Sequence, residues 1–241
     1  MIEHIEQGTL PPGRKACIAL TSWKKRINTV GLTIFNLMCV CGPEFHIVLT
    51  LAEEEFPGKE WELPYDLVLM KKLGLFEILW IKPNYKSFKK VLFAMHKYPM
   101  APIISADDGC IYIDNFAKKL YSIWAAGNRR YIIANKYWGE DEFPGGGGGH
   151  GTLYPPNCFG DIGIKTLELY GDKMLRNPND DRFMAVLSGM MRIQWKYTKD
   201  FGCEKCPFIN ITTEGLSSNN AYIKGDNWKF PKYINLAMQH R

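Results

Sequence analysis

Residues 16–38, ACIALTSWKKRINTVGLTIFNLM, read as a strand, a polar turn and a helix in immediate succession. Ala16 to Leu20 form an apolar run of strand length, and the polar turn after it ends at Arg26. From Asn28 to Met38 apolar residues recur on one helical face, and we expect Asn28 to be the N-cap. A strand that leads through a polar turn into an amphipathic helix is the building unit of α/β folds.

The same alternation continues to about residue 130. Four further apolar runs lie at 46–51, 76–81, 103–106 and 131–134. Amphipathic stretches lie between the runs, at 28–38, 64–73, 87–98 and 114–124. The alternation predicts an α/β fold with a mostly parallel central sheet flanked by helices.

The sequence changes character after residue 135. Five consecutive glycines occupy 145–149, and a helical segment runs from Asp180 to about Gln194. No segment repeats at a period of about 20 to 50 residues. We therefore expect a single domain, 1–241, in which residues 131–241 complete a site made by residues 15–130.

Composition excludes several classes of protein. The 241 residues carry 30 Lys and Arg against 25 Asp and Glu, a formal charge of +5, and 46% are hydrophobic. These values are typical of a globular protein with a sizeable core and exclude a disordered or fibrous chain. Because the positive excess is mild and no nucleic-acid-binding module is recognisable, no nucleic-acid partner is expected.

Cysteine usage and hydropathy bear on location. Seven cysteines at irregular spacing favour a reducing cytoplasm over a secreted disulfide framework. Residues 1–14 contain no apolar stretch of signal-peptide length, and no run of about 18 apolar residues could span a membrane. The sequence predicts a cytoplasmic protein that is soluble, or at most peripheral to the inner face of the membrane.

Polar residues directly after the apolar runs are the first candidates for a site, because open parallel sheets bind ligands at the carboxyl ends of their strands. Asp107 and Asp108 follow the run that ends at residue 106. Two adjacent carboxylates there repel each other unless a divalent metal or a polar ligand meets them, although a solvated turn also explains them. The turns after the first and third runs add Thr21, Ser22, Arg26, Lys86, Lys89 and Lys90.

Asp180 and Asp181 open the helical segment of the second half. Acidic residues favour the first turn of a helix, so one interpretation is a helix cap. The other is a general base, because transfer to a hydroxyl acceptor needs a carboxylate that takes its proton. The lysines within 86–90 are likewise either a solvated helix face or a diphosphate site at a helix N-terminus.

Three further features have two interpretations each. The glycine run 145–149 is either a flexible loop or a backbone that lies close against a sugar or acceptor, and it matches no P-loop. Cys203 and Cys206 form a lone CxxC, for which structural zinc and a redox role are the two interpretations, and it lacks the second pair that a zinc site needs. His150 and His240 can act as metal ligands or as ordinary surface or core residues.

Six segments carry features whose order identifies a family better than any one feature does. The order is a strand, an acidic turn, a glycine-rich loop, Tyr-Pro-Pro, and Asp-Asp before a helix. The six segments are ALTSWKKRI (19–27), IVLTLAEEEFP (47–57), ILWIKPNYKSFKKVLFAMHKYP (78–99), IISADDGCIYIDNFAKKLY (103–121), GGGGGHGTLYPPNCF (145–159) and NDDRFMAVL (179–187). With these segments the chain resembles small bacterial glycosyltransferases of the GT-A fold, related to family 2 and found in capsular and lipopolysaccharide assembly.

The resemblance implies an inverting transfer from a nucleotide-sugar donor, expected to be a UDP-sugar, to a hydroxyl of a glycan or lipid-linked glycan. Residues 15–130 would bind the donor and residues 131–241 the acceptor; no oligomeric state is implied. Asp180 or Asp181 would be the base, and a Mn²⁺ or Mg²⁺ ion would stabilise the leaving group. The donor would lie near Thr21, Ser22, Arg26, Lys86, Lys89, Lys90, Asp107 and Asp108.

Gly109 departs from the family's pattern, because the acidic turn usually carries a third acidic residue whose position serves the metal. Either Asp108 holds the metal, helped by His150 or His240, or metal dependence is weak, or the enzyme is impaired. A nucleotide-sugar-binding protein without turnover and a sugar-phosphate nucleotidyltransferase are the alternatives. The second predicts a glycine-rich loop after the first strand, and residues 21–26 contain no glycine.

Overall fold

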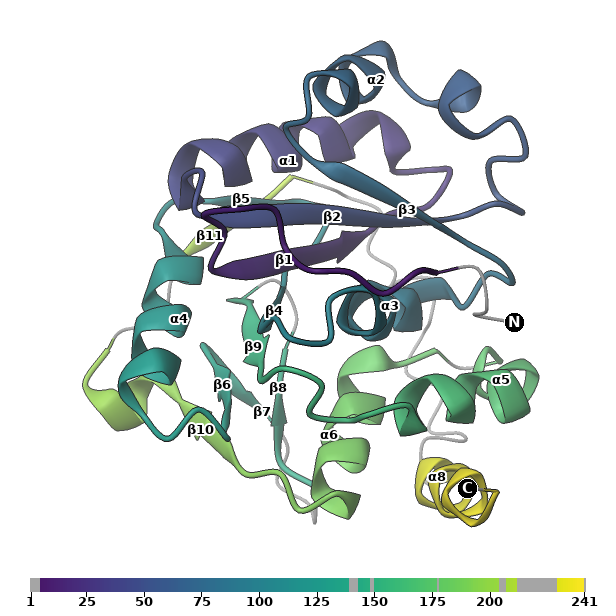
Figure 1. The fold of residues 1–241 in the computed structure, drawn as a ribbon, viewed down its shortest axis with the longest axis vertical. Helices are drawn as coiled ribbons and strands as arrows, with labels where there is room; N and C mark the ends of the chain where they lie inside the picture. Colours follow the sequence, from purple (N-terminus) through teal and green to yellow (C-terminus); the bar gives the residue numbers. More distant parts are fainter. Residues whose placement is uncertain are drawn as a thin grey trace.

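The computed structural model describes residues 5–138, 143–147, 150–176, 178–203, 207–211 and 229–240 (Figure 1). Within these ranges a central sheet of seven strands is flanked by helices. From one edge to the other its strands are β10 (Trp195–Tyr197), β6 (Ile132–Ala134), β9 (Thr152–Tyr154), β4 (Ile103–Ser105), β1 (Ala16–Thr21), β2 (Phe45–Ala52) and β3 (Glu77–Ile81).

The sheet is mostly parallel, which confirms the predicted fold class. β1 pairs in parallel with β2 and β4, β2 with β3, and β10 with β6. Only β9, among the described strands of this sheet, runs antiparallel to its neighbours, β4 and β6. Two small sheets complete the described strands: β5 (Cys110–Tyr112) with β11 (Phe208–Asn210), and β7 (Tyr137–Trp138) with β8 (Gly145–Gly146).

Helices cover both faces of the sheet and enclose two cores (Figure 1). Alternate side chains of β1 enter different cores, with Ile18 and Leu20 on one side and Cys17 and Ala19 on the other. A strand buried on both faces reads as a continuous apolar run, as residues 16–20 do. The first core lies under α1 (Ile27–Cys41), α2 (Tyr65–Lys72) and α4 (Phe116–Ala126), and the second under α3 (Lys89–Lys97), α5 (Ile162–Met174), α6 (Asp180–Met190) and α8 (Phe230–Gln239).

Two helix ends differ from the sequence prediction. α1 begins at Ile27 with Arg26 at the N-cap, so the prediction of an Asn28 cap is wrong. The helix starts earlier because the backbone oxygen of Arg26 already accepts hydrogen bonds from the Thr29 and Val30 amides, at 2.9 and 3.3 Å. α6 ends at Met190 rather than near residue 194, because Arg192 adopts a left-handed φ of 56° and the chain turns into β10. No helix in the described ranges has the length and apolar character needed to cross a membrane.

Candidate active site

The polar turns after β1 and β4 meet at one edge of the sheet. β1 and β4 are parallel neighbours, with Ala19 opposite Ser105, so both strands end at the same edge. The positions that the sequence singles out in these turns are Thr21, Ser22, Arg26, Asp107 and Asp108. The residues that follow the first and fourth apolar runs are therefore close in space.

Asp108 joins the two turns. Its Oδ2 accepts a hydrogen bond from Ser22 Oγ at 2.7 Å, and its Oδ1 lies 2.5 Å from Arg26 Nη1. Thr33 of α1 donates a third hydrogen bond to the backbone oxygen of Asp108, at 3.0 Å. Burial raises the pKa of the Asp108 carboxyl above its ordinary value, although Arg26 and Ser22 act in the opposite direction. Both carboxylate oxygens thus hold the strand-end turns together.

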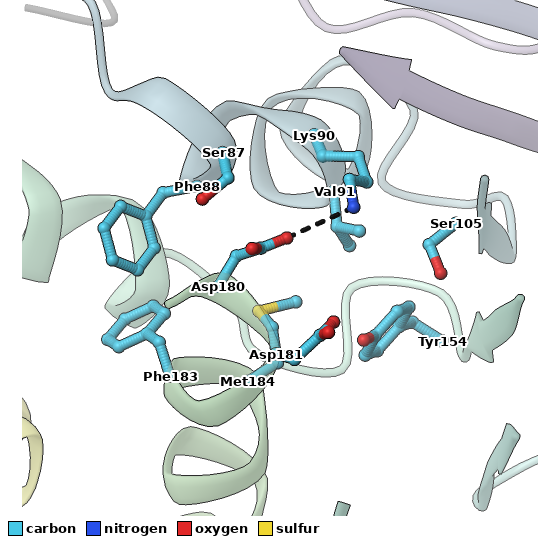
Figure 2. A pocket seen from close by; sticks show the side chains of 10 residues that line it. All are labelled: Ser87, Phe88, Lys90, Val91, Ser105, Tyr154, Asp180, Asp181, Phe183 and Met184. Atoms are coloured by element: carbon cyan, nitrogen blue, oxygen red, sulfur yellow. Dashed lines mark ion pairs between the residues drawn. The ribbon is translucent and has the colours of Figure 1, made fainter. Parts of the chain in front are cut away.

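A lysine and a group of carboxylates lie beside this pair. Lys90 lies in the first turn of α3, and its Nζ is 2.7 Å from Asp107 Oδ1 and 3.3 Å from Asp180 Oδ2. Figure 2 draws the ion pair between Lys90 and Asp180. Burial acts to lower the pKa of Lys90, but the charges of Asp107, Asp180 and Asp181 outweigh it and raise that pKa well above its ordinary value. These four residues are called the Lys90 cluster; its lysine stays protonated at neutral pH.

A small pocket opens at the Lys90 cluster (Figure 2). Ser87, in the 3₁₀ turn η2 (Lys86–Phe88) ahead of α3, is 8% exposed, and its hydroxyl has no hydrogen-bond partner among the described residues. A buried hydroxyl without a partner is unfavourable, so this position suits a polar ligand or water. The polar lining of the pocket is Ser87, Lys90, Ser105, Tyr154, Asp180 and Asp181.

Two glycines of the run lie close to their neighbours, and one of them lies against Asp181. A Cβ added to Gly147 would lie 2.2 Å from Asp181 Oδ1, and a Cβ on Gly146 would lie 2.4 Å from that of Ala134. Only glycine allows the backbone to approach its neighbours so closely. Of the two interpretations of the run, a backbone in close contact therefore fits Gly146 and Gly147. The neighbour of Gly147 is the Asp181 carboxylate, not a sugar or acceptor. Residues 148 and 149 lie outside the described ranges.

Lys89 and Thr21 are buried beside the site, and their side chains bind neighbouring segments of the fold. Lys89 Nζ lies 3.3 Å from Asn84 Oδ1 and 3.6 Å from Glu55 Oε2. Burial lowers the pKa of Lys89, although Glu55 opposes the shift. Thr21 Oγ1 donates to the backbone oxygen of Thr50 at 2.7 Å, so it ties β1 to β2.

Other predicted site residues contact other parts of the fold. Lys86 is exposed and donates to the backbone oxygen of Leu175 beyond α5, at 2.9 Å. His240 follows α8, and its backbone oxygen accepts a hydrogen bond from Lys165 Nζ. His150 lies ahead of β9, where its backbone oxygen accepts from Asn135 Nδ2 at 2.6 Å. In the CxxC, the second cysteine lies outside the described residues.

The carboxylates, as arranged, do not fit the predicted divalent cation. Both Asp108 oxygens contact Ser22 or Arg26, and Asp107 Oδ1 contacts Lys90. Within the described ranges no three His, Cys, Asp or Glu side chains are grouped as a set of metal ligands. Divalent Mn²⁺ and Mg²⁺ need carboxylate oxygens that do not already hold a cation. A metal bound by Asp108 and His150 therefore stays a prediction.

Two polar residues at this edge were not singled out from the sequence. Ser87 precedes a helix, where hydroxyls commonly occur as caps, so its type alone is not informative. Asn135 directly follows β6, is 5% exposed, and leaves Oδ1 without a partner among the described residues. The rule that selected Asp107 and Asp108, a polar residue after an apolar run, would also have selected Asn135.

No protein-family model matches the chain, and no curated protein sequence matches it either. The fold is similar to that of the mannosyltransferase PcManGT from Pyrobaculum calidifontis, solved in complex with GDP-Man and Mn²⁺. The identity is 10%, the match covers 99% of this chain and 79% of that chain, and the TM-score is 0.51. An active-site mutant of LgtC matches at 10% identity over 75% of this chain and 72% of that chain, with a TM-score of 0.48.

A third solved structure, the apo form of the glycosyltransferase GlyE from Streptococcus pneumoniae, matches at 12% identity. It covers 94% of this chain and 64% of that chain, with a TM-score of 0.44. At such identities only the fold is shared, and the PcManGT match carries that conclusion. The chain thus has the GT-A fold, a mixed α/β architecture with a mostly parallel sheet flanked by helices.

Proposed function

We propose that the protein is a glycosyltransferase, which moves a sugar from a nucleotide-sugar donor to a hydroxyl acceptor. One observation carries the proposal: the Lys90 cluster and its pocket lie where β4 ends and α3 and α6 begin. Open α/β sheets bind their ligands beyond the carboxyl ends of the strands. The Lys90 ammonium, in the first turn of α3, and the positive end of that helix dipole favour an anionic diphosphate there.

The proposed reaction uses a carboxylate base and a cationic site for the leaving group. The acceptor hydroxyl gives its proton to Asp181 while its oxygen forms a bond to the anomeric carbon of the donor. The bond from that carbon to the diphosphate breaks, and the electron pair leaves with the diphosphate. Attack opposite the departing group inverts the anomeric configuration. The mechanism contains no metal-bound step, because the described carboxylates do not fit one.

Asp181 is preferred to Asp180 as the base. Asp180 Oδ2 lies 3.3 Å from Lys90 Nζ, so we assign this carboxylate to holding the lysine. Asp181 lines the same pocket, and the backbone of Gly147 fixes one side of its carboxylate. Asp180 then positions Lys90, and Asp181 takes the proton.

The finer parts of the proposal come from the resemblance of the sequence. A UDP-sugar is the proposed donor, with residues 15–130 as the donor-binding half and 131–241 as the acceptor-binding half. Assembly of a bacterial surface polysaccharide in the cytoplasm, at a glycan or lipid-linked glycan acceptor, is the proposed setting. Similarity to PcManGT, a mannosyltransferase solved with GDP-Man and Mn²⁺, supports a nucleotide-sugar donor without selecting the sugar.

Incubation with a panel of UDP-, GDP- and CMP-sugars tests the proposal, with Mn²⁺ or with EDTA, and with or without glycan acceptors. We expect at least one donor to be consumed, faster with an acceptor present, and its nucleoside diphosphate to be released. Donor consumption is measured by chromatography, and binding of UDP, GDP and CMP by calorimetry. Absence of both binding and consumption across the panel would contradict the proposal.

A nucleotide-sugar-binding protein without turnover is the second candidate, and Gly109 favours it. This glycine stands at the third position of the acidic turn, and its backbone oxygen accepts a hydrogen bond from the Ile211 amide at 2.8 Å. The position thus supplies no carboxylate to the site. Binding of UDP in calorimetry together with no consumption of any donor would select this candidate.

Gly147→Ala is expected to lower turnover, because the new side chain meets Asp181 and strains a backbone whose φ is 156°. The new Cβ would meet Asp181 Oδ1 at 2.2 Å, so the carboxylate must move away. Displacing a catalytic carboxylate by about 1 Å lowers the reaction rate about a hundredfold. The measurements are kcat and the thermal midpoint, with Gly13→Ala as the control, because Gly13 also has a positive φ and nothing lies within 4 Å of a Cβ there. Equal kcat in both variants would show that the position of Asp181 is unimportant.

A further inference from the structure

Lys90 lies at the point where carboxylates from two separate elements converge. Asp107 comes from the turn after β4 and Asp180 from the first turn of α6, and the ammonium lies between them at 2.7 and 3.3 Å. The Lys90 side chain is 11% exposed, so little solvent weakens these contacts. Carboxylates that converge from separate elements are what a divalent cation requires, but here an ammonium holds them.

A divalent cation and Lys90 exclude each other at this point. An ion bound by Asp107 and Asp180 would lie within a few ångströms of the Lys90 ammonium, and their repulsion would be strong in a site so poorly exposed to water. Asp108 offers no alternative, because Arg26 and Ser22 contact its two oxygens. Either Lys90 leaves the cluster or the metal stays out.

The surroundings of Lys90 suit an anionic leaving group. Ser87, whose hydroxyl lacks a partner among the described residues and is more than nine-tenths buried, lines the same pocket. Ser87 and Lys90 flank the start of α3, a nine-residue helix that continues directly from the 3₁₀ turn η2. A hydroxyl and an ammonium at the positive end of a helix dipole together can bind the oxygens of a phosphate.

We propose that the Lys90 ammonium takes the place of a divalent cation in this protein, and that it binds the departing diphosphate together with Ser87 and the N-terminus of α3. The proposal rests on the proposed glycosyl transfer. As the bond from the anomeric carbon to the diphosphate breaks, the electron pair and its negative charge pass to the diphosphate oxygen. That oxygen meets Lys90, which leaves Asp107 and Asp180 for it in part.

The unmodified protein gives the first test. UDP and GDP are titrated into it by calorimetry in EDTA and again in Mn²⁺, and we expect the two dissociation constants to agree within about threefold. A charge-assisted hydrogen bond to phosphate is worth about tenfold or more in affinity. Loss of binding by that factor in EDTA would therefore overturn the proposal, because it would mean that a metal supplies the charge.

Lys90→Met gives the second test, with Lys97→Met on the same helix as its control. Without the ammonium, Asp107 and Asp180 lose the cation that both of them contact, so we expect this variant to bind Mn²⁺ that the unmodified protein does not. Free Mn²⁺ is measured by electron paramagnetic resonance, and thermal melts check the folding of each variant. We also expect metal-free UDP affinity to fall about tenfold in Lys90→Met and not in Lys97→Met.

The Mn²⁺ measurement separates failure of this proposal from failure of the proposed function. If no nucleotide binds, the proposed function is wrong. Mn²⁺ binding by Lys90→Met, and not by the unmodified protein or Lys97→Met, would still show that the ammonium occupies a cation site. If the unmodified protein binds Mn²⁺ and Lys90→Met binds it no better, the replacement is wrong whatever the nucleotide results. Should Lys90→Met fail to fold, the EDTA comparison and the Mn²⁺ titration on the unmodified protein decide.

Discussion

Asp181→Asn is expected to lower kcat by about two to four orders of magnitude, the usual contribution of a general base. Asparagine keeps the size of the side chain and its place beside Gly147, but it cannot accept the proton of the acceptor hydroxyl. Affinity for UDP should change little, because the base acts on the acceptor. Steady-state transfer rates and calorimetry on the same preparation measure both quantities.

Two further variants define what that loss means. Asp161→Asn is the matched control, since Asp161 is exposed at the start of α5, caps nothing with its side chain, and should keep full activity. Asp180→Asn should lose less in kcat and more in metal-free UDP affinity, because it loosens Lys90. A larger kcat loss in Asp180→Asn than in Asp181→Asn would reverse the assignment of the base.

Asp108→Ala is expected to destabilise the fold by about 3–5 kcal/mol, because it removes one partner of a buried ion pair. For a chain of this length, that loss corresponds to a fall of about 6–20 °C in the thermal midpoint. The Asp108 and Arg26 side chains are 6% and 10% exposed, so water cannot replace the lost partner. Chemical denaturation and thermal melts measure the effect.

Glu44→Ala is the control for this loss. Glu44 pairs with Lys15 at 3.2 Å, but both side chains are substantially exposed, and such pairs contribute about 0–1 kcal/mol. The double replacement Arg26→Met with Asp108→Leu should recover much of the stability, since both members of the buried pair become apolar. If Asp108→Ala and Glu44→Ala have the same thermal midpoint, the ion pair between Arg26 and Asp108 does not stabilise the fold. The prediction that Asp108 binds a metal then gains support.

The strand and helix order could be predicted because burial is expressed in the periodicity of the chain. Residues 16–20 are apolar throughout, as expected of a strand covered on both faces, and 28–38 repeat with the helical period. The order of the strands could not be predicted. β9 has three residues, and its antiparallel place between β4 and β6 depends on contacts distant in sequence.

The candidate site could be predicted as a list of positions but not as a set of pairs. Polar residues after apolar runs include Ser22, Asp107 and Asp108, and all three lie at the predicted edge of the sheet. Nothing in the spacing shows that Ser22 and Arg26 hold Asp108 while Lys90 meets Asp107. Sequence patterns describe which residues can act, whereas partner choice depends on distances that only folding sets.

The stretch 16–38 by itself determined an α/β unit, with a buried strand, a polar turn and a helix, because hydrophobic burial follows directly from residue order. Tertiary structure alone decided what the polar residues of the turn do. Ser22 and Arg26 bind Asp108, 86 and 82 residues further along the chain, and Lys90 lies between Asp107 and Asp180. Charges distant in sequence compensate one another only where the fold removes them from water together, so their pairing is a property of the folded chain.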